Sequence, residues 1–323
     1  MAFNPYEHCD MMGLTPWEPI DFRTQFFYMV PPYIHPSYFT HWRDENMTWK
    51  RSGYLFAGLT LTPTGYIEGP DVIRFLSENT TNSYKNFPVG KTKHVMICNE
   101  DGNIVMHGLV LRIAEDKVWT STVYPWLVAL AKKGTYDISF ETTTYTRFIF
   151  QMGGAATLNS LEAACGEDLH DIPFLGHREV TMCGKRVRIL RMTMSGTLGY
   201  EVHGDTPDAK ELFAHILKAG EPYGLQQVGW LCYNSNITEN GMPQEYTTFS
   251  TCGHEDPFFM EALAEQGYDT RFWPGHFPLM GSSASKGVER YYRNPIELGW
   301  DVSVQDGHDF TGKEALQIGR AHV

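Results

Sequence analysis

The stretch Ser195-Gly196-Thr197-Leu198-Gly199-Tyr200-Glu201-Val202-His203-Gly204, followed by residues 207–219, decides the fold class. A glycine-rich turn leads into a strand-like run, which ends at a glycine and gives way to a helix-like run. Thr206 suits the N-cap of that helix, Pro207 suits its first position, and Gly220 ends the pattern. This stretch therefore predicts a strand followed by a helix.

Two earlier stretches repeat the same order of strand, glycine and helix, at residues 65–78 and 147–165. Two hairpins lie between them, each centred on a turn signal. The first joins residues 94–99 to 104–113, and the second joins 179–182 to 185–192. The pattern predicts an α+β fold, with helices packed on mostly antiparallel sheets.

Composition is that of a globular protein of about two domains. The chain has 323 residues, of which 42% are hydrophobic, 20% charged and 14% aromatic. The aromatic share suits a protein that holds flat ligands, although core packing accounts for most such residues. We expect an N-terminal arm over residues 1–50, with a short helix near 39–50, and a folded body over 51–316. The end, Ile318-Gly319-Arg320-Ala321-His322-Val323, resembles a translated sequencing adapter, so residues 317–323 are expected to be a non-native tail.

The charge balance limits the partners. There are 26 Lys and Arg against 38 Asp and Glu, a formal net charge of −12, which argues against binding nucleic acid. No apolar run reaches 18 residues, and no basic and apolar leader opens the chain, so neither a membrane span nor a signal peptide is expected. The six cysteines form no CxxC pair and indicate reduced thiols in a cytoplasmic protein.

Two further patterns have simple explanations. Cys252, His254 and His276 match no common zinc spacing, so we expect no metal. Residues 185–191 carry four basic side chains in an acidic protein. They form either a solvated strand face or a site for an anionic ligand tail, such as a polyglutamate chain.

Four segments carry a resemblance to a known family: residues 195–202, 229–243, 294–300 and 309–316. We interpret the second as a polar loop with Tyr233 at its head. In this order they resemble the aminomethyltransferase (glycine-cleavage T-protein) superfamily. The closer resemblance is to the tetrahydrofolate-dependent aryl O-demethylases. It rests on His41-Trp42-Arg43, Tyr233-Asn234-Ser235-Asn236 and Tyr291-Tyr292-Arg293-Asn294-Pro295.

The resemblance implies a fold, a cofactor and an activity. The fold would be the T-protein type, two interleaved α+β subdomains within residues 51–316, with the family's C-terminal β-barrel domain truncated here. The cofactor would be tetrahydrofolate. The activity would be transfer of a methyl group from a small molecule, such as a methoxylated aromatic, to N5 of tetrahydrofolate.

The resemblance also implies roles for single residues. Glu201 would bind the pterin ring, since one carboxylate can accept two parallel hydrogen bonds. The alternative is an exposed strand glutamate. Tyr200, Asn236 and Tyr292 are expected to contact the cofactor as well.

Two residues are candidate catalysts. Tyr233 would donate a proton to the departing phenolate oxygen, which lowers the barrier to breaking a methyl ether. The alternative is a buried structural tyrosine whose hydroxyl is bonded. His107 lies where the family has a carboxylate and could act as an acid or base near neutral pH. The alternative is a satisfied histidine on a strand.

The sequence also departs from the family. No carboxylate occurs in residues 105–108, and Leu231 and Asn236 replace T-protein arginines, which argues against glycine cleavage. The demethylase histidine is missing from residues 55–62. The substrate-binding arginine is missing from residues 120–123, which indicates a neutral methoxy-aromatic or a different donor. Two alternatives stay open: an enzyme acting on a C–N methyl donor, and a non-catalytic folate-binding homologue.

Overall fold

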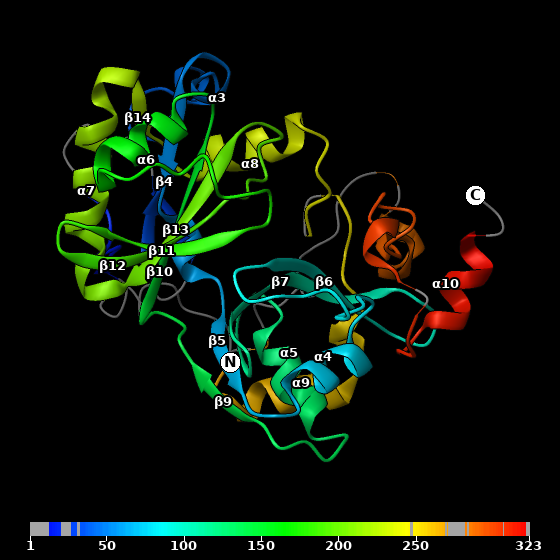
Figure 1. Ribbon diagram of the computed structural model, residues 1–323. Helices are drawn as coiled ribbons and strands as arrows, with labels where there is room; N and C mark the ends of the chain where they lie inside the picture. Colours follow the sequence, from blue (N-terminus) through cyan, green and yellow to red (C-terminus); the bar gives the residue numbers. More distant parts are fainter. Residues whose placement is uncertain are drawn as a thin grey trace. The chain divides into compact units, whose positions relative to one another are not determined.

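The computed structural model describes residues 13–20, 27–30, 33–245, 248–268, 270, 282, 284–305 and 307–320. The chain divides into two compact units, each built from two separate segments (Figure 1). The first unit comprises Met1–Leu61 and Tyr145–Met242, and the second comprises Thr62–Thr144 and Pro243–Val323.

The first unit is built on a six-stranded sheet in the order β11-β12-β13-β10-β4-β14. Its strands pair antiparallel except for β14 beside β4. The bounds are β4 Gly53–Phe56, β10 Arg147–Gly153, β11 His177–Met182, β12 Lys185–Leu190, β13 Gly199–Asp205 and β14 Leu225–Gln227. A three-stranded sheet precedes them, formed by β1 Gly13–Leu14, β3 Tyr33–Pro36 and β2 Phe27–Val30.

Helices cover both faces of the six-stranded sheet (Figure 1). On one face, α6 (Thr157–Cys165) and α7 (Ala209–Gly220) bury apolar side chains against Phe150 and Val202. On the other face, α8 (Trp230–Glu239) packs on Tyr54 and Phe56 of β4. The short helices α2 (Trp42–Asn46) and α3 (Thr48–Arg51) lie in the expected region 39–50, and α2 contacts α8.

The segment interpreted as a polar loop is the helix α8, so that interpretation is wrong. Its Asn, Ser and Thr residues favour turns in isolation, but Cys232, Tyr233, Asn236 and Ile237 are all buried at helical spacing. The fully buried Glu45 accepts a hydrogen bond from the N–H of Gly229, the N-cap of α8. Tertiary packing thus overrides the weak local preference.

The start of α7 also differs from the prediction. Residues Thr206–Asp208 form a separate 3₁₀ turn, and the α-helix begins at Ala209, with Asp208 and not Thr206 as its N-cap. Pro207 is accommodated in that turn. The other predicted strands, hairpins and helices agree with the structure to within about two residues.

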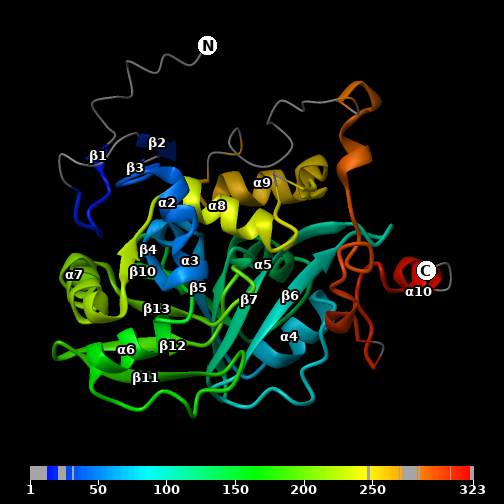
Figure 2. The ribbon, with the colours of Figure 1, turned by 90° about the horizontal axis from the view of Figure 1, so that it is seen from above.

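The second unit is built on a fully antiparallel five-stranded sheet, β6-β7-β8-β5-β9. The bounds are β5 Thr64–Glu68, β6 Thr92–Cys98, β7 Ile104–Ala114, β8 Lys117–Ser121 and β9 Ser139–Thr142. The long strands β6 and β7 run side by side (Figure 2). One core joins this sheet to α4 Val72–Asn79, α5 Tyr124–Ala131 and α9 Pro257–Glu265. The last helix, α10, spans Lys313–Arg320.

Among the described residues, the remaining regular segments are 3₁₀ turns at Gly58–Leu61, Glu221–Tyr223, Gly253–Glu255, Ala284–Lys286, Val288–Tyr291 and Asp301–Ser303. The α+β class is confirmed. Among the residues described, no helix is both long enough and apolar enough to span a membrane. The adapter origin of residues 317–323 stays a prediction.

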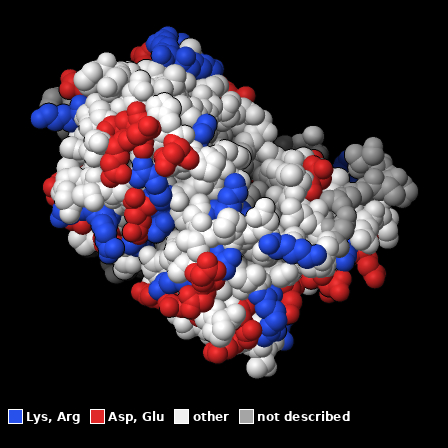
Figure 3. Space-filling model, viewed as in Figure 1, with Lys and Arg blue, Asp and Glu red and all other residues white. Residues whose placement is uncertain are grey.

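The basic strand β12 is largely neutralised by carboxylates of its own unit. Lys185 pairs with Asp208 at 2.7 Å, and Arg188 pairs with Glu179 at 2.8 Å. Acidic side chains lie among the basic ones on the viewed face (Figure 3). This favours the solvated strand face over a site for an anionic tail.

The buried carboxyl of Glu18 predicts a pH-dependent stability. Burial raises the pKa of Glu18 from 4.5 to about 7, against hydrogen bonds from Thr15 and Gln227 that lower it. The folded state therefore binds more protons than the unfolded chain between about pH 4.5 and 7, so the unfolding free energy falls as pH rises through that window, by roughly 3 kcal/mol.

Glu18→Gln should remove this contribution. Urea unfolding at pH 5 and pH 8 should show the variant gaining stability over the parent only at the higher pH. Glu221→Gln, a change at an exposed site, is the matched control. The same difference between variant and parent at both pH values would contradict the prediction.

Candidate functional site

The candidate site lies on the face of the six-stranded sheet that α8 covers, here called the α8 face. Strand register places Glu201 of β13 opposite Gln151 of β10, and Gln151 opposite Phe56 of β4. Residues paired in this way point to the same side of a sheet, and two strand spacings amount to about 10 Å. Glu201, Gln151 and Phe56 therefore form a row about 10 Å long across three strands.

Glu201 stands at one end of this row and is buried, with 4% of its surface exposed. The alternative of an exposed strand glutamate is therefore wrong. Its Oε2 lies 2.8 Å from Nε2 of His203, which is buried on the same strand face. Burial lowers the pKa of His203, outweighing the opposing effect of Glu201, so the ring is neutral and donates its Nε2–H to the carboxylate.

Gln151 stands in the middle of the row and is fully buried. The hydroxyl of Tyr54 donates to its Oε1 at 3.1 Å, and burial raises the pKa of Tyr54, so that hydroxyl keeps its proton. The amide Nε2 of Gln151 is buried without a hydrogen-bond partner among the described residues. Sequence reasoning missed Gln151 because its relation to Glu201 appears only once the two strands are in register.

Tyr233 lies at the other end, on α8. Its ring stacks on Phe56 with centroids 4.5 Å apart and planes at 14°, and 3% of the residue is exposed. Its hydroxyl donates to Sδ of Met194 at 3.1 Å. A thioether is a weak hydrogen-bond acceptor.

Asn236 lies three residues after Tyr233, on the same side of α8. Its Nδ2 contacts Sγ of Cys232 at 3.4 Å, and its Oδ1 is buried without a partner in the described part of the chain. Asn236 also lies beside the hydroxyl of Tyr54. The α8 face therefore carries an unused buried acceptor, on Asn236, and an unused buried donor, on Gln151.

Tyr200 lies on the opposite side of β13 from Glu201, because side chains alternate along a strand. It is 1% exposed and packs in the apolar core with Phe150 and Leu161. Tyr200 therefore does not lie on the α8 face with Glu201. Contact between Tyr200 and the cofactor stays a prediction, and the strand geometry does not support it.

His107 belongs to the second unit, on β7. Its Nδ1 lies 3.1 Å from Nε2 of His94, its Nε2 lies 3.5 Å from Oε2 of Glu245, and the ring of Trp300 lies 4.8 Å away. Burial, with a smaller effect of His94, lowers the pKa of His107 well below 6.5. The lowered pKa counts against the expected titration near neutral pH. The Nε2 of His107 is buried without a hydrogen-bond partner among the described residues, so the alternative of a satisfied strand histidine gains no support either, and the role of His107 stays a prediction.

Tyr292 is also in the second unit, 8% exposed and part of its core. Its hydroxyl lies 3.2 Å from Nε2 of His254, and burial raises its pKa. Of the predicted site residues, Glu201, Tyr233 and Asn236 share the α8 face of the first unit, whereas His107 and Tyr292 lie in the second.

The absence of a metal stays a prediction. Cys252 and His254 lie in the second unit, and His276 lies outside the described residues. Elsewhere, ligand atoms of Glu162, Asp168 and His170 come within 4.8 Å of one another. Asp168 and His170 are exposed and already pair with each other at 3.0 Å, as surface charges commonly do.

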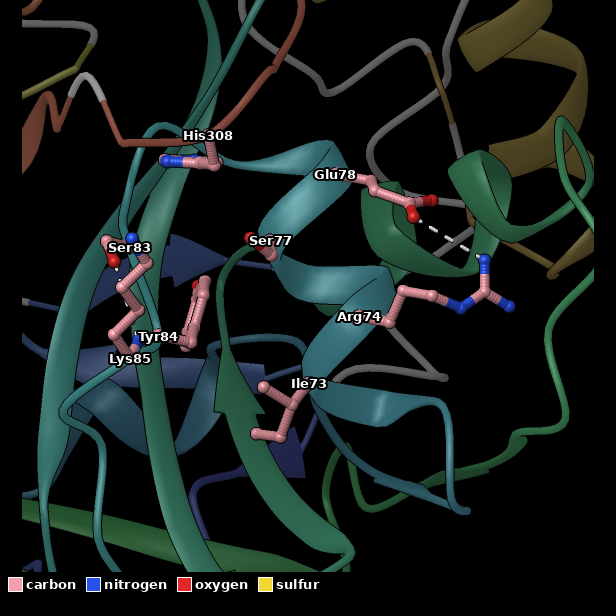
Figure 4. A pocket seen from close by; sticks show the side chains of 8 residues that line it. All are labelled: Ile73, Arg74, Ser77, Glu78, Ser83, Tyr84, Lys85 and His308. Atoms are coloured by element: carbon pink, nitrogen blue, oxygen red, sulfur yellow. Dashed lines mark hydrogen bonds and ion pairs between the residues drawn. The ribbon is translucent and has the colours of Figure 1, made fainter.

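A hollow of about 410 Å³ opens in the second unit (Figure 4). Arg74 and Glu78 on its rim pair with each other. None of the predicted site residues lines it; its lining is Ile73, Arg74, Ser77, Glu78, Ser83, Tyr84, Lys85 and His308.

Comparison with known proteins identifies what the chain resembles. The family model described as the GCVT N-terminal domain matches residues 12–250. A sesamin methylene transferase from a Sinomonas species is 35% identical over 289 residues, which are 87% of this chain and 62% of that protein. A syringate O-demethylase from a Sphingobium species is 28% identical over 295 residues, 87% of this chain and 63% of that protein.

The glycine cleavage system aminomethyltransferase T of Bartonella henselae has a similar structure. The TM-score is 0.69 at 15% identity, covering 93% of this chain and 72% of that one. This confirms the T-protein type of fold. The chain spans a little under two thirds of the length of the two enzymes above.

Proposed function

The chain belongs to the family defined by the GCVT N-terminal domain, and from that premise we propose that it transfers a one-carbon group from an aryl ether to N5 of tetrahydrofolate. The observation that carries the proposal is the α8 face. It holds a buried carboxylate, Glu201, and a buried tyrosine, Tyr233, at opposite ends of one row of side chains. The row, about 10 Å long, suits a flat bicyclic ring.

The residues of this face fit a pterin. Glu201 presents a carboxylate to ring N–H groups, and the unpartnered Nε2 of Gln151 and Oδ1 of Asn236 are polar atoms that a heterocycle could satisfy. Tetrahydrofolate, when bound, supplies the nucleophilic N5 that accepts the one-carbon group. Glu201, Gln151 and Asn236 would hold and orient its ring.

Tyr233 would act on the leaving group. A methyl ether is cleaved only if the departing oxygen is stabilised, and a nearby phenol can give that oxygen a proton. The overall reaction converts ArO–CH₃ and tetrahydrofolate to ArOH and 5-methyl-tetrahydrofolate, with the N5 proton balancing the phenol formed. The hydroxyl of Tyr233 would pass that proton to the departing oxygen.

The donor belongs to one of two closely related classes. The two relatives named above act, by their names, on a methylene group of sesamin and a methyl group of syringate. A methylenedioxy donor would yield a catechol and 5,10-methylene-tetrahydrofolate, since both N5 and N10 lose a proton. We propose a neutral donor, because residues 120–123 contain no arginine to bind a carboxylate.

We also propose a division of the chain into domains and a cellular location. Residues 51–316 are proposed as the folate-binding body, preceded by an arm over residues 1–50. A cytoplasmic location is proposed from the acidic composition and the cysteines, of which Cys98, Cys165, Cys183, Cys232 and Cys252 are free thiols.

A donor panel tests the proposal. Purified protein is incubated with tetrahydrofolate and methoxy-aromatics, methylenedioxy-aromatics or methylamines, and methyl- and methylene-tetrahydrofolate are quantified. Product from an aryl ether is expected. If only methylamines give product, the proposed function is wrong and the protein transfers a methyl group from a C–N donor. If the protein binds folate tightly but turns over no donor, it is a non-catalytic homologue.

A further inference from the structure

The hollow of the second unit lies between helix α4 and residues 83–85, with His308 at its edge (Figure 4). Its volume of about 410 Å³ is in the range of small-molecule sites. None of the residues assigned to the one-carbon transfer lines it. Arg74 and Glu78 on its rim pair with each other at 3.5 Å and point away from Lys85, so they leave the centre to other groups.

Lys85 supplies a positive charge at one side of the hollow. It is exposed and makes no ion pair with any described residue, in a chain of net charge −12. Its Nζ lies 3.6 Å from the position that a Cβ atom on Gly307 would take. The charge is therefore held next to the segment that carries His308.

A second ammonium group adds to the positive potential here. Nζ of Lys93 lies 6.0 Å from the centroid of the Tyr84 ring, which lines the hollow. Burial, with a smaller effect of Lys91, lowers the pKa of Lys93, which is the behaviour of a cation in unfavourable surroundings. An anion bound nearby would relieve this unfavourable potential.

His308 supplies a hydrogen-bond acceptor on the same side. Its Nε2 lies 3.0 Å from the backbone oxygen of Thr80, which can only accept, so Nε2 carries the proton. In the neutral ring Nδ1 is then the acceptor. That Nδ1 is buried and has no hydrogen-bond partner in the described part of the chain. Native proteins rarely leave such an atom unless a ligand or water completes it.

The other lining groups are apolar side chains and hydroxyls. Ile73 and the ring of Tyr84 supply apolar surface, and Ser77 and Ser83 supply hydroxyls. The oxygen of Ser83 accepts a hydrogen bond from the N–H of Lys85 at 3.4 Å, so its own O–H can donate to an anion beside that lysine. The hollow thus combines a cation, a hydroxyl donor and a buried acceptor with apolar surface.

We propose that this hollow binds a hydroxylated aromatic carboxylate. The carboxylate pairs with Lys85, and the hydroxyl donates to Nδ1 of His308. The ring lies against Ile73 and Tyr84. Because the cation and the acceptor are on the same side, the hydroxyl belongs at the 3-position rather than opposite the carboxylate, and a 2-hydroxyl would bond to its own carboxylate. The site belongs to the second unit and does not depend on the proposed function.

Ligand-observed NMR titration of the whole chain with 3-hydroxybenzoate, without tetrahydrofolate, tests the site. We expect a dissociation constant of about 0.1–1 mM, as befits a ligand of this size. Benzoate lacks the hydroxyl and phenol lacks the carboxylate, so each should bind about 5- to 10-fold more weakly. Equal affinities for benzoate and 3-hydroxybenzoate would overturn the contact with His308. Absence of binding at about 10 mM would overturn the site itself.

Two substitutions locate the binding. Lys85→Gln should weaken 3-hydroxybenzoate by about 5- to 10-fold and leave phenol unchanged. His308→Phe should make 3-hydroxybenzoate bind no better than benzoate. Lys286→Gln, at an exposed lysine of the same unit outside the lining, is the matched control and should change no affinity. If His308→Phe fails to fold, the ligand comparison and Lys85→Gln still decide the proposal.

Tyr233→Phe separates this site from the α8 face. Tyr233 belongs to the first unit, so its substitution should leave the affinity for 3-hydroxybenzoate unchanged. If Tyr233→Phe abolishes binding and Lys85→Gln has no effect, the acid binds at the α8 face, and this inference is wrong while the proposed function stands. If the protein transfers no one-carbon group but binds the acid through Lys85, the proposed function fails and this inference stands.

Discussion

Tyr233→Phe should lower the rate of aryl ether cleavage by about 10²- to 10⁴-fold, the usual contribution of a general acid, while tetrahydrofolate still binds. The substitution removes only the hydroxyl. The ring keeps its stacking on Phe56 at 4.5 Å and its edge contact with Trp230 at 5.8 Å, so the packing of α8 is preserved. Single-turnover formation of methyl-tetrahydrofolate measures the effect on the transfer step.

Tyr84→Phe is the matched control for that experiment. Tyr84 is a buried tyrosine of the second unit whose hydroxyl bonds to Thr80 at 2.9 Å. Its loss should affect stability slightly and leave the transfer rate unchanged. If the Tyr233→Phe protein cleaves ethers at the same rate as the parent, Tyr233 takes no part in the reaction and serves only in packing.

Glu201→Gln is the second substitution with a large expected effect. It should weaken tetrahydrofolate binding by about 10- to 1,000-fold, because hydrogen bonds to a charged group are strong and the new amide presents a donor to ring N–H groups. Size and burial are preserved, so the unit should stay folded. Calorimetric titration measures the affinity, with thermal unfolding to confirm the fold.

The control for Glu201 is Glu179→Gln on β11, the edge strand of the same sheet, separated from β13 by β12. Glu179 pairs with Arg188 at 2.8 Å at the edge of the sheet and is half exposed, and its loss should leave folate affinity within a factor of two. Equal affinities for the parent and Glu201→Gln proteins would end the assignment of Glu201 to the pterin, whatever the fate of Tyr233.

Much of the fold could be predicted because local signals and packing agree. The strand Gly199–Asp205 and the hairpin of β6 and β7 follow from alternation and turn residues, and both occur as expected. The failure at α8 has the opposite cause. Its sequence is rich in turn-forming Asn, Ser and Thr, and it becomes helical through burial against β4 and a hydrogen bond to Glu45, which is 184 residues away.

The candidate site could be predicted only in part. Glu201 and Tyr233 were identified through the family resemblance, and both lie on the α8 face. Gln151 was not, because its importance depends on cross-strand register with Glu201, which a single sequence does not reveal. The ring of Trp300, far along the chain, helps to bury His107, so the lowered pKa of His107 could not be predicted from the sequence either.

The most direct measurement follows a labelled carbon. Protein, tetrahydrofolate and a neutral aryl ether carrying ¹³C in its methoxy group are mixed, and the products are examined by NMR. The ¹³C label is predicted to appear on N5 of 5-methyl-tetrahydrofolate in an amount equal to the phenol released, and to disappear in Tyr233→Phe. Label recovered as methanol or formaldehyde, or phenol released without tetrahydrofolate, would contradict transfer to the folate.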